Sequence, residues 1–250
     1  MQPPQSTYPT RSTYFPLMGQ VVSPARLEKY RQHPTDPDFD LHERYLWNIA
    51  LCESFYCALQ YLEVGLRNNV HNSAANHFGN PLWFDIYPSI LQPEAHRQIA
   101  KVRGRLRRDQ RSDAGRIVAG LDFGFWTSLF NDHYEQLLWR QGNLLTQVFP
   151  AIPNSLTHPR TRTYVSSRLN NIRKFRNRVF HHEPICNWRM AGTVRAVPQR
   201  HADILEVLNW ISPSLYATAQ AAARFPAVYA TGSSPYRNQL NAIINSLPPP

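Results

Sequence analysis

The chain has 250 residues, and 42% of them are hydrophobic, so it is long enough to bury a substantial core in one domain. Its formal net charge of +10 favours a polyanionic partner, such as nucleic acid or an anionic membrane surface, over an acidic protein substrate. No apolar run approaches the roughly 20 residues of a membrane-spanning helix, and the N-terminus lacks the charged start and apolar block of a signal peptide. We therefore expect a cytoplasmic protein without a membrane anchor.

The cysteines and histidines show no pattern of a disulfide or metal site. Cys52, Cys57 and Cys186 are an odd number without C-x-x-C spacing, which argues against a disulfide framework and a zinc knuckle and predicts reduced thiols. His181 and His182 precede Cys186, but the sequence offers no fourth ligand for a metal ion. Because glycine-rich phosphate loops and H-E-x-x-H patterns are missing too, we expect no metal ion and no cofactor.

The two ends of the chain differ from its middle. Residues 1–20 combine four prolines with serine, threonine and glutamine, which indicates a flexible or loosely docked arm. Ser23-Pro24 predicts an N-cap followed by proline at the first helical position. Residues 21–225 are expected to form a single helical domain. Residues 226–250 end in three prolines, and there a disordered tail is favoured over a short helix near residues 239–247.

The first long element is a helix. Asp40, with Glu43 three residues later, predicts an acidic capping box at its start. Apolar residues keep helical spacing to about Phe78, where Gly79-Asn80-Pro81 predicts the end. The connection over residues 80–93 is rich in proline and aromatic residues, so we expect it to pack on the core.

A strongly basic segment follows. Between Arg97 and Arg116, eight positive charges stand against two aspartates. Such a cluster neutralises phosphates independently of sequence and predicts salt-dependent RNA binding, whereas the alternative is a solvated helix face. The residues that we predict to contact RNA are Lys101, Arg103, Arg105, Arg107, Arg108 and Arg111.

Three further helices are predicted, two before and one after the helix that contains Arg176. Asp113 predicts the cap of a short helix, and residues 122–124 predict a turn into another helix over residues 125–140. Aromatic residues at helical spacing in this second helix favour core packing over base stacking. The last helix, over residues 198–225, should be kinked or divided at Pro213.

Two charged residues occupy apolar helix faces. One apolar stripe runs through Val165, Leu169, Ile172, Arg176 and Val179. Because a guanidinium keeps its proton, burying Arg176 requires an acidic partner or a polar cavity. Glu63 falls on the stripe of the long helix, four residues after Leu59. We predict that Glu63 lies near Arg176 and orients it; the alternative places Leu62 in the core and Glu63 at its edge.

A family resemblance starts from the same segment. Residues 176–181, Arg-Asn-Arg-Val-Phe-His, resemble the Arg-polar-x-x-x-His signature of the HEPN superfamily of all-helical ribonucleases. The further stretches that carry the resemblance are Glu-Val-Gly-Leu-Arg-Asn at 63–68, Gly-Asn-Pro-Leu-Trp at 79–83, and Leu-Asp-Phe-Gly-Phe-Trp-Thr-Ser-Leu-Phe at 121–130 with Tyr134 and Trp139 beyond. With the His-His-Glu-Pro-Ile ending, their order and spacing resemble the Abi-like (abortive infection) branch over roughly residues 25 to 210.

The resemblance implies a fold and a biological setting. It implies an all-α, HEPN-like helical bundle with a composite site at a homodimer interface, to which each subunit brings one Arg and His set. It further implies a bacterial defence or toxin-like role, in which RNA cleavage is restrained by a protein antitoxin or a structured RNA.

The motif residues suit RNA cleavage without a metal ion. Histidine suits proton transfer near neutral pH, so we assign acid/base work to His181. Arginine stabilises the charge on a phosphate, so Arg176 would hold the scissile group, with Asn177 orienting either partner. His182 and Arg178 are expected to support them. Attack by the 2′-hydroxyl would leave a 2′,3′-cyclic phosphate.

The geometry of the motif adds a condition. Positions 176 and 181 lie about 140° apart on a regular helix, so one straight helix does not bring their side chains together. A helix end near His181, which Pro184 favours, or a second copy of the chain would do so. The motif residues thus predict a metal-independent endoribonuclease, and the resemblance to the Abi-like branch implies that it belongs to an antiphage or toxin–antitoxin system. Alternatives are a non-catalytic RNA-binding regulatory module and a helical protein-interaction scaffold without RNA affinity.

Overall fold

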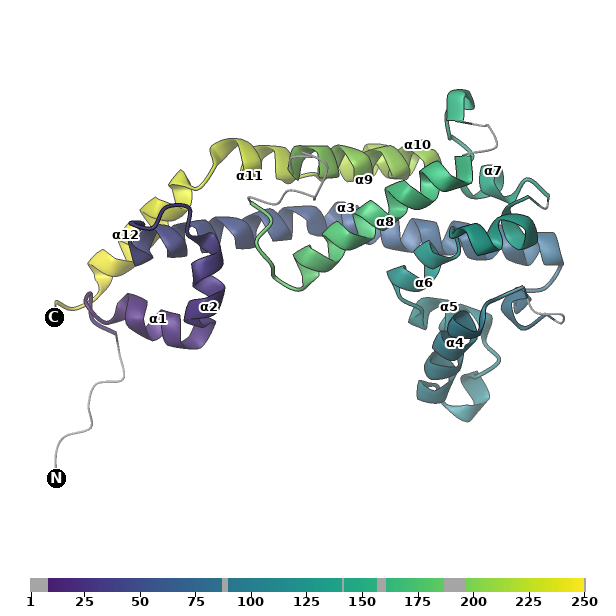
Figure 1. Cartoon of the computed structure of the whole chain (residues 1–250), viewed down its shortest axis with the longest axis horizontal. Helices are drawn as coiled ribbons and strands as arrows, with labels where there is room; N and C mark the ends of the chain where they lie inside the picture. Colours follow the sequence, from purple (N-terminus) through teal and green to yellow (C-terminus); the bar gives the residue numbers. More distant parts are fainter. Residues whose placement is uncertain (1–8, 87–89, 141, 157–160, 187–196, 250) are drawn as a thin grey trace. The chain divides into compact units, whose positions relative to one another are not determined.

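The fold is all-α, as the sequence predicts. The structure, a computed structural model, describes residues 9–86, 90–140, 142–156, 161–186 and 197–249, and none of these is in a strand. The chain divides into two compact units. The terminal unit comprises residues 1–55, 178–198 and 224–250, and the central unit comprises residues 56–177 and 199–223. Helices α3 (Asp38–Phe78) and α8 (Thr161–Phe180) contribute residues to both units (Figure 1).

The terminal unit contains helices from both ends of the chain. Besides the first part of α3, its helices are α1 (Tyr14–Val22), α2 (Pro24–Leu27), the 3₁₀ turn Glu28–Tyr30, α11 (Phe225–Thr231) and α12 (Ser234–Ser246). Ser23 caps α2 as predicted, because its side chain accepts a hydrogen bond from the backbone N–H of Arg26.

The described part of the expected N-terminal arm is helical. Within α1, the Phe15 ring packs against the rings of Phe39 and His42, with centroids 5.8 and 4.8 Å apart. Before it, the Arg11 guanidinium donates hydrogen bonds to the carbonyls of Asn245 and Leu247. Partners that are distant in sequence therefore order a segment whose composition predicts no regular structure.

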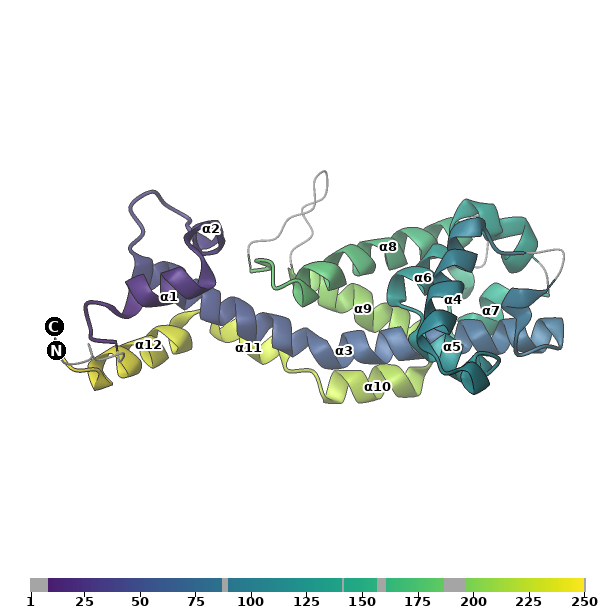
Figure 2. The same cartoon turned by 90° about the horizontal axis from the view of Figure 1, so that it is seen from below.

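The C-terminal segment corrects a second expectation, since helices α11 and α12 replace the predicted disordered tail (Figure 2). Arg237 of α12 binds the carboxylates of Asp40 and Glu43, each at 2.6 Å. Leu240 is buried, and the indole N–H of Trp47 donates to the Val228 carbonyl. The predicted capping box is also wrong, because α3 begins at Asp38 and the two carboxylates bind Arg237 instead.

The central unit holds the remaining elements. Besides parts of α3 and α8, they are α4 (Pro93–Arg105), α5 (Ala114–Gly120), α6 (Phe123–Ser128), α7 (Leu144–Val148), α9 (Val197–Ile211, from residue 199), α10 (Pro213–Ala221) and the short turns Trp83–Asp85, Arg108–Gln110, Asp132–Tyr134, Glu135–Trp139 and Asn154–Leu156. Trp83 and Phe84 are buried, so this part of the aromatic connection packs as predicted, while Tyr87 lies outside the described residues.

Capping side chains set several of these helix ends. Asp113 accepts from the Arg116 backbone N–H at 3.0 Å, which confirms the predicted cap of α5. Asp122 accepts from the Phe125 N–H at 2.8 Å and is therefore the N-cap of α6, so Phe123 and Gly124 of the predicted turn lie in the helix. The predicted division at Pro213 is confirmed, because α10 starts there behind the Ser212 cap.

The predicted helix over residues 125–140 is wrong. Helix α6 ends at Ser128, and 3₁₀ and π turns follow it. The Trp139 indole stacks on Phe130, with centroids 4.2 Å apart, and donates its N–H to the Leu129 carbonyl. The Arg162 guanidinium donates to the Phe130 carbonyl at 2.7 Å. Core packing of the aromatic rings, which was predicted, folds the chain back on itself and interrupts the helix.

Charged residues are also buried in the central unit. Arg200 and Asp203 are fully buried and form an ion pair at 2.9 Å. Arg168 binds Asp203 as well, and it pairs with Glu206 at 2.9 Å. In the described part of the chain, no helix combines the length and the apolar character that crossing a membrane requires.

Candidate functional site

The core-facing stripe of α8 differs from the predicted one by one residue. Phe175 is fully buried, whereas about a quarter of the Arg176 side chain is exposed. A phenyl ring enters an apolar core without losing hydrogen bonds to water, whereas a guanidinium does not, so the ring takes the central position. On α3, Leu62 is likewise fully buried and Glu63 lies at the edge of the core.

Glu63 and Arg176 form the predicted ion pair. The Nη2 atom of Arg176 lies 3.2 Å from Oε2 and 3.3 Å from Oε1 of Glu63, and both side chains are about a quarter exposed. Both sequence alternatives are thus partly right, since Glu63 lies at the edge of the core and still binds Arg176. The carboxylate restricts the guanidinium while leaving part of it open to solvent.

The end of α8 presents the two histidines to solvent. The helix ends at Phe180, close to the predicted position, and His182 adopts a left-handed backbone conformation with φ of +56°. The Glu183 N–H donates to the Arg178 carbonyl at 2.9 Å, which closes the last turn, and the side chains of the same two residues form an ion pair at 3.1 Å. Both His181 and His182 are exposed.

Other elements of the terminal unit anchor the segment behind the motif. The Arg26 guanidinium donates to the His182 carbonyl at 2.7 Å. The Asn48 side chain accepts from the Ile185 N–H at 2.7 Å and donates to the Glu183 carbonyl. Side chains from α2 and α3 therefore hold the backbone of the segment that begins at His182 in place.

The boundary between the two units divides the predicted motif. Arg176 and Asn177 belong to the central unit, whereas Arg178, His181 and His182 belong to the terminal unit. In the central unit, Glu63 binds Arg176. In the terminal unit, hydrogen bonds from Arg26 and Asn48 hold the backbone around His182. The predicted roles of these five residues remain predictions.

The basic segment carries less available charge than its sequence suggests. Carboxylates pair with four of its arginines: Arg97 with Glu94, Arg103 with Asp85, Arg107 with Asp109 and Arg116 with Asp113. Arg111 donates its Nε–H to the Leu106 carbonyl. Lys101, Arg105 and Arg108 are exposed, and no carboxylate of the described residues pairs with them. Of the six predicted RNA contacts, these three are exposed and bind neither a carboxylate nor a backbone carbonyl of the described residues, so their charge is free to meet a phosphate.

The cysteines are free thiols, each of them half-buried rather than packed deep in a core. Burial, with smaller contributions from Cys186 and Glu53, raises the pKa of Cys52 to about 12, so its thiol stays protonated at neutral pH. Across the described ranges, no cluster of three or more His, Cys, Asp or Glu side chains is placed to hold a metal ion.

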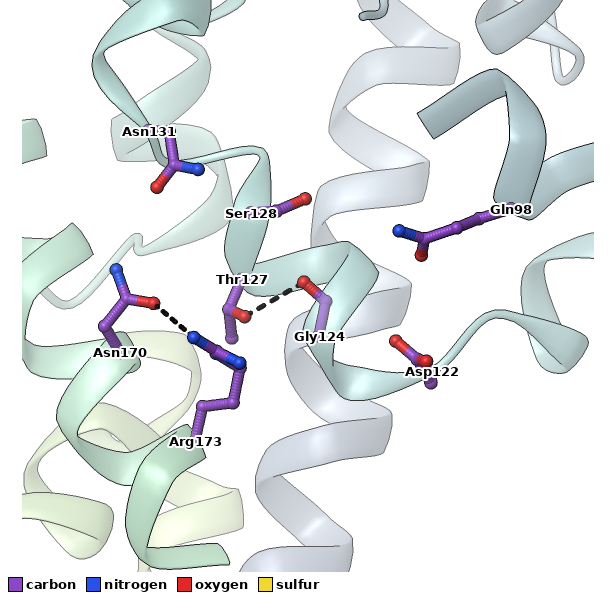
Figure 3. A pocket seen from close by; sticks show the side chains of 8 residues that line it. All are labelled: Gln98, Asp122, Gly124, Thr127, Ser128, Asn131, Asn170 and Arg173. Carbon is purple, nitrogen blue, oxygen red and sulfur yellow. Dashed lines mark hydrogen bonds between the residues drawn. The ribbon is translucent and has the colours of Figure 1, made fainter. Parts of the chain in front are cut away.

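A polar pocket beside the predicted site was missed by the sequence reasoning. It lies in the central unit, and Figure 3 shows Asn170 and Arg173 of α8 facing the polar side chains of α6. Asn170, Arg173 and Asn177 follow +3, +4 spacing and thus share one face of α8. This polar stripe, beside the apolar one, is the signal in the sequence that indicates the pocket.

Comparison of the chain with protein-family models, curated protein sequences and solved structures yields no match. Membership of the Abi-like branch of the HEPN superfamily therefore remains a hypothesis carried by the motifs of the sequence. The structure agrees with it at the level of fold class, which many unrelated functions share.

Proposed function

We propose that the protein is a metal-independent endoribonuclease of the Abi-like, HEPN type that cleaves RNA in a bacterial antiphage defence or toxin–antitoxin system. The observation that carries the proposal is the ion pair between Glu63 and Arg176. It holds a partly open guanidinium within the motif that resembles a ribonuclease signature. A bidentate donor of this kind suits the phosphate of an RNA strand, whose charge increases as the 2′-hydroxyl attacks.

The exposed histidines supply the second element of the proposal. His181 is accessible for proton transfer, and the anchoring of the adjacent His182 carbonyl by Arg26 limits its backbone freedom. In this mechanism one histidine accepts the 2′-hydroxyl proton, Arg176 stabilises the charged phosphate, and a histidine returns a proton to the 5′-oxygen. Asn177 orients the phosphate, and Arg178 and His182 support the turn.

The same hypothesis implies two kinds of partner, a second copy of the chain and an inhibitor. A composite site would need a homodimer, in which a second copy supplies the additional Arg and His set. A protein antitoxin or structured RNA would restrain the enzyme in the bacterial cytoplasm, a reducing compartment with which three free cysteines are compatible. Light scattering that finds one protomer at every concentration would contradict the composite site.

The test is incubation of purified protein with synthetic RNA in EDTA, followed by analysis of product ends. We expect wild-type protein to leave 2′,3′-cyclic phosphate. The Arg176→Ala and His181→Ala variants should each lose about 10²-fold or more of the rate, as for other groups that act in a transition state. His33→Ala, which removes an exposed histidine elsewhere, should cleave like wild type. Equal cleavage by wild type and His181→Ala would refute the assignment.

Glu63→Gln separates positioning from folding. The amide keeps the size of the side chain but weakens its hold on Arg176, so we expect a fall of about tenfold in rate. Unfolding should change by less than about 1 kcal/mol, because the pair is partly solvated. Wild-type activity in this variant would show that the ion pair does not serve catalysis.

A second candidate is a non-catalytic RNA-binding regulatory module. It is favoured by Lys101, Arg105 and Arg108, which are exposed and lack carboxylate partners among the described residues. RNA that is bound but left intact by wild-type protein in EDTA would support this function over cleavage.

A further inference from the structure

A polar cavity of about 270 Å³ lies in the central unit, between α4, α6 and α8 (Figure 3). Its lining consists of Gln98, Asp122, Gly124, Thr127, Ser128, Asn131, Asn170 and Arg173. Every one of these except Gly124 has a polar side chain, which is unlike the mostly apolar lining of typical small-molecule sites. The volume is near the lower end of the roughly 300–1,000 Å³ of such sites, so a ligand no larger than about one nucleotide fits inside.

Arg173 brings to this cavity a guanidinium that forms no ion pair with the described residues. Its guanidinium makes a long hydrogen bond of 3.4 Å to the side-chain oxygen of Asn170, and no carboxylate of the described residues pairs with it. The exposed carboxylate of Asp122 also lines the cavity and keeps its negative charge while it accepts the Phe125 N–H as the cap of α6, so an anion is expected to bind on the Arg173 side. A half-buried guanidinium that no carboxylate contacts is available to bind an anionic group directly.

The other lining groups are neutral and offer both donors and acceptors. Asn131 is exposed, and its side-chain amide has no hydrogen-bond partner among the described residues. The hydroxyl of Ser128 donates to the carbonyl of residue 125, which leaves its lone pairs available, whereas Thr127 is fully buried and its hydroxyl donates to the carbonyl of residue 124. The cavity therefore suits an anion that carries further hydrogen-bonding groups.

We propose that this cavity binds the phosphate ester of a nucleotide, with Arg173 on the phosphate and the side chains of Gln98, Asn131 and Asn170 on the sugar and base. Arginine binds phosphate through charge-assisted, bidentate hydrogen bonds, which places it on the anionic part of the ligand. The hydroxyls and amides match groups that a nucleotide carries and that an inorganic anion lacks.

The source of the nucleotide is a strand of RNA, an assignment that rests on the proposed ribonuclease function. Arg173 lies four residues before Asn177 on the same face of α8, so a strand whose scissile phosphate meets the motif passes the cavity within about one helical turn. The cavity would then hold a nucleotide that neighbours the cleaved bond.

The test compares Arg173→Gln with Lys174→Gln. Both variants remove one positive charge from neighbouring positions of α8, but residue 174 is exposed and does not line the cavity. Binding is measured by titration calorimetry with each nucleoside monophosphate, with inorganic phosphate and with a short RNA. We expect Arg173→Gln to weaken nucleotide and RNA binding about tenfold, a loss of about 1.4 kcal/mol, and Lys174→Gln to change it less than about twofold.

A second variant guards against a folding defect in the first. Asn131→Asp adds a negative charge at an exposed position of the cavity, so it should weaken phosphate binding while the thermal midpoint stays near that of wild type. Equal binding by wild type, Arg173→Gln and Asn131→Asp would overturn the proposal, as would wild-type protein that binds none of the probes.

The outcomes also separate this proposal from the ribonuclease. Nucleotide binding that depends on Arg173, in a wild-type protein that cleaves no RNA, would support the cavity and contradict the proposed enzyme. RNA binding that depends on Arg173 without measurable monophosphate binding would support an RNA strand as the ligand. Cleavage that is insensitive to Arg173, with no Arg173-dependent binding, would leave the enzyme standing and overturn the cavity.

Discussion

Two groups of arginines in the central unit have different environments. In the basic segment over residues 97–116, the side chains of Arg97, Arg107 and Arg116 are more than half exposed, although each pairs with a carboxylate nearby in sequence. On α8 and α9, Arg168 and Arg200 are nearly or fully buried, and both bind Asp203. Helix α8 itself carries six Lys and Arg residues and no Asp or Glu, so the two regions are similarly basic in sequence.

The difference shows that the density of positive charge in the sequence does not locate the charges with the largest structural effect, because burial sets that effect. Exposed ion pairs contribute about 0–1 kcal/mol, because water solvates their separated charges almost as well. Removing one member of a buried pair costs much more, because it leaves an uncompensated charge in the core.

The largest effect is expected for Asp203→Asn. The amide keeps the shape of the side chain but removes the buried carboxylate that Arg168 and Arg200 share, while Arg168 keeps its pair with Glu206, so the free energy of unfolding should fall by about 3–5 kcal/mol. Asp109→Asn removes the carboxylate of an exposed, solvated pair and should leave the free energy of unfolding nearly unchanged. Urea unfolding of both variants measures the difference, and equal losses would contradict the comparison.

A moderate effect is expected when the unpaired charges of the basic segment are removed. The triple variant Lys101→Ala, Arg105→Ala, Arg108→Ala should reduce the slope of log affinity for single-stranded RNA against log salt by about 2, at roughly 0.7 per phosphate contact. The matched variant Arg97→Ala, Arg107→Ala, Arg116→Ala removes the same charge from ion-paired positions. Its slope should change less. Similar slopes for the two variants would show that pairing does not limit contact with RNA.

The smallest effect concerns acid stability. The Trp83 indole N–H donates to Nδ1 of His71, and burial lowers the pKa of this histidine below its ordinary value of 6.5. Below pH 6.5 the unfolded ring takes up a proton before the folded ring does. The free energy of unfolding should therefore fall as the pH drops, by at most about 1.4 kcal/mol per pH unit.

The variant His71→Asn keeps an acceptor near Trp83 but does not titrate. Urea unfolding between pH 7 and pH 5 should consequently show a flatter dependence in this variant than in wild type. His201, whose pKa burial also lowers, is expected to contribute part of the slope that remains. Identical slopes in both proteins would exclude His71 as a source of the acid sensitivity.

Helix caps and helix ends can be predicted from the sequence alone, because they depend on residues that are close together in the chain. Ser23 before Pro24, Asp113 and Ser212 before Pro213 cap helices, because a capping side chain bonds a backbone N–H two or three residues away. The end of α3 and the end of α8 near His181 follow equally from local backbone preferences. Even the pairing of Glu63 with Arg176 was predictable, since two opposite charges at apolar helix faces stabilise each other.

Contacts between residues that are far apart in the sequence become known only from the tertiary structure. Arg237 binds α3 and helps order the C-terminal helices, the packing of Trp139 on Phe130 interrupts a predicted helix, and Arg173 meets α6 at a polar cavity. Periodicity also left open whether Phe175 or Arg176 faces the core, a choice set by the cost of desolvating a charge. These outcomes depend on packing and desolvation between distant segments, which the spacing of residues along one helix does not report.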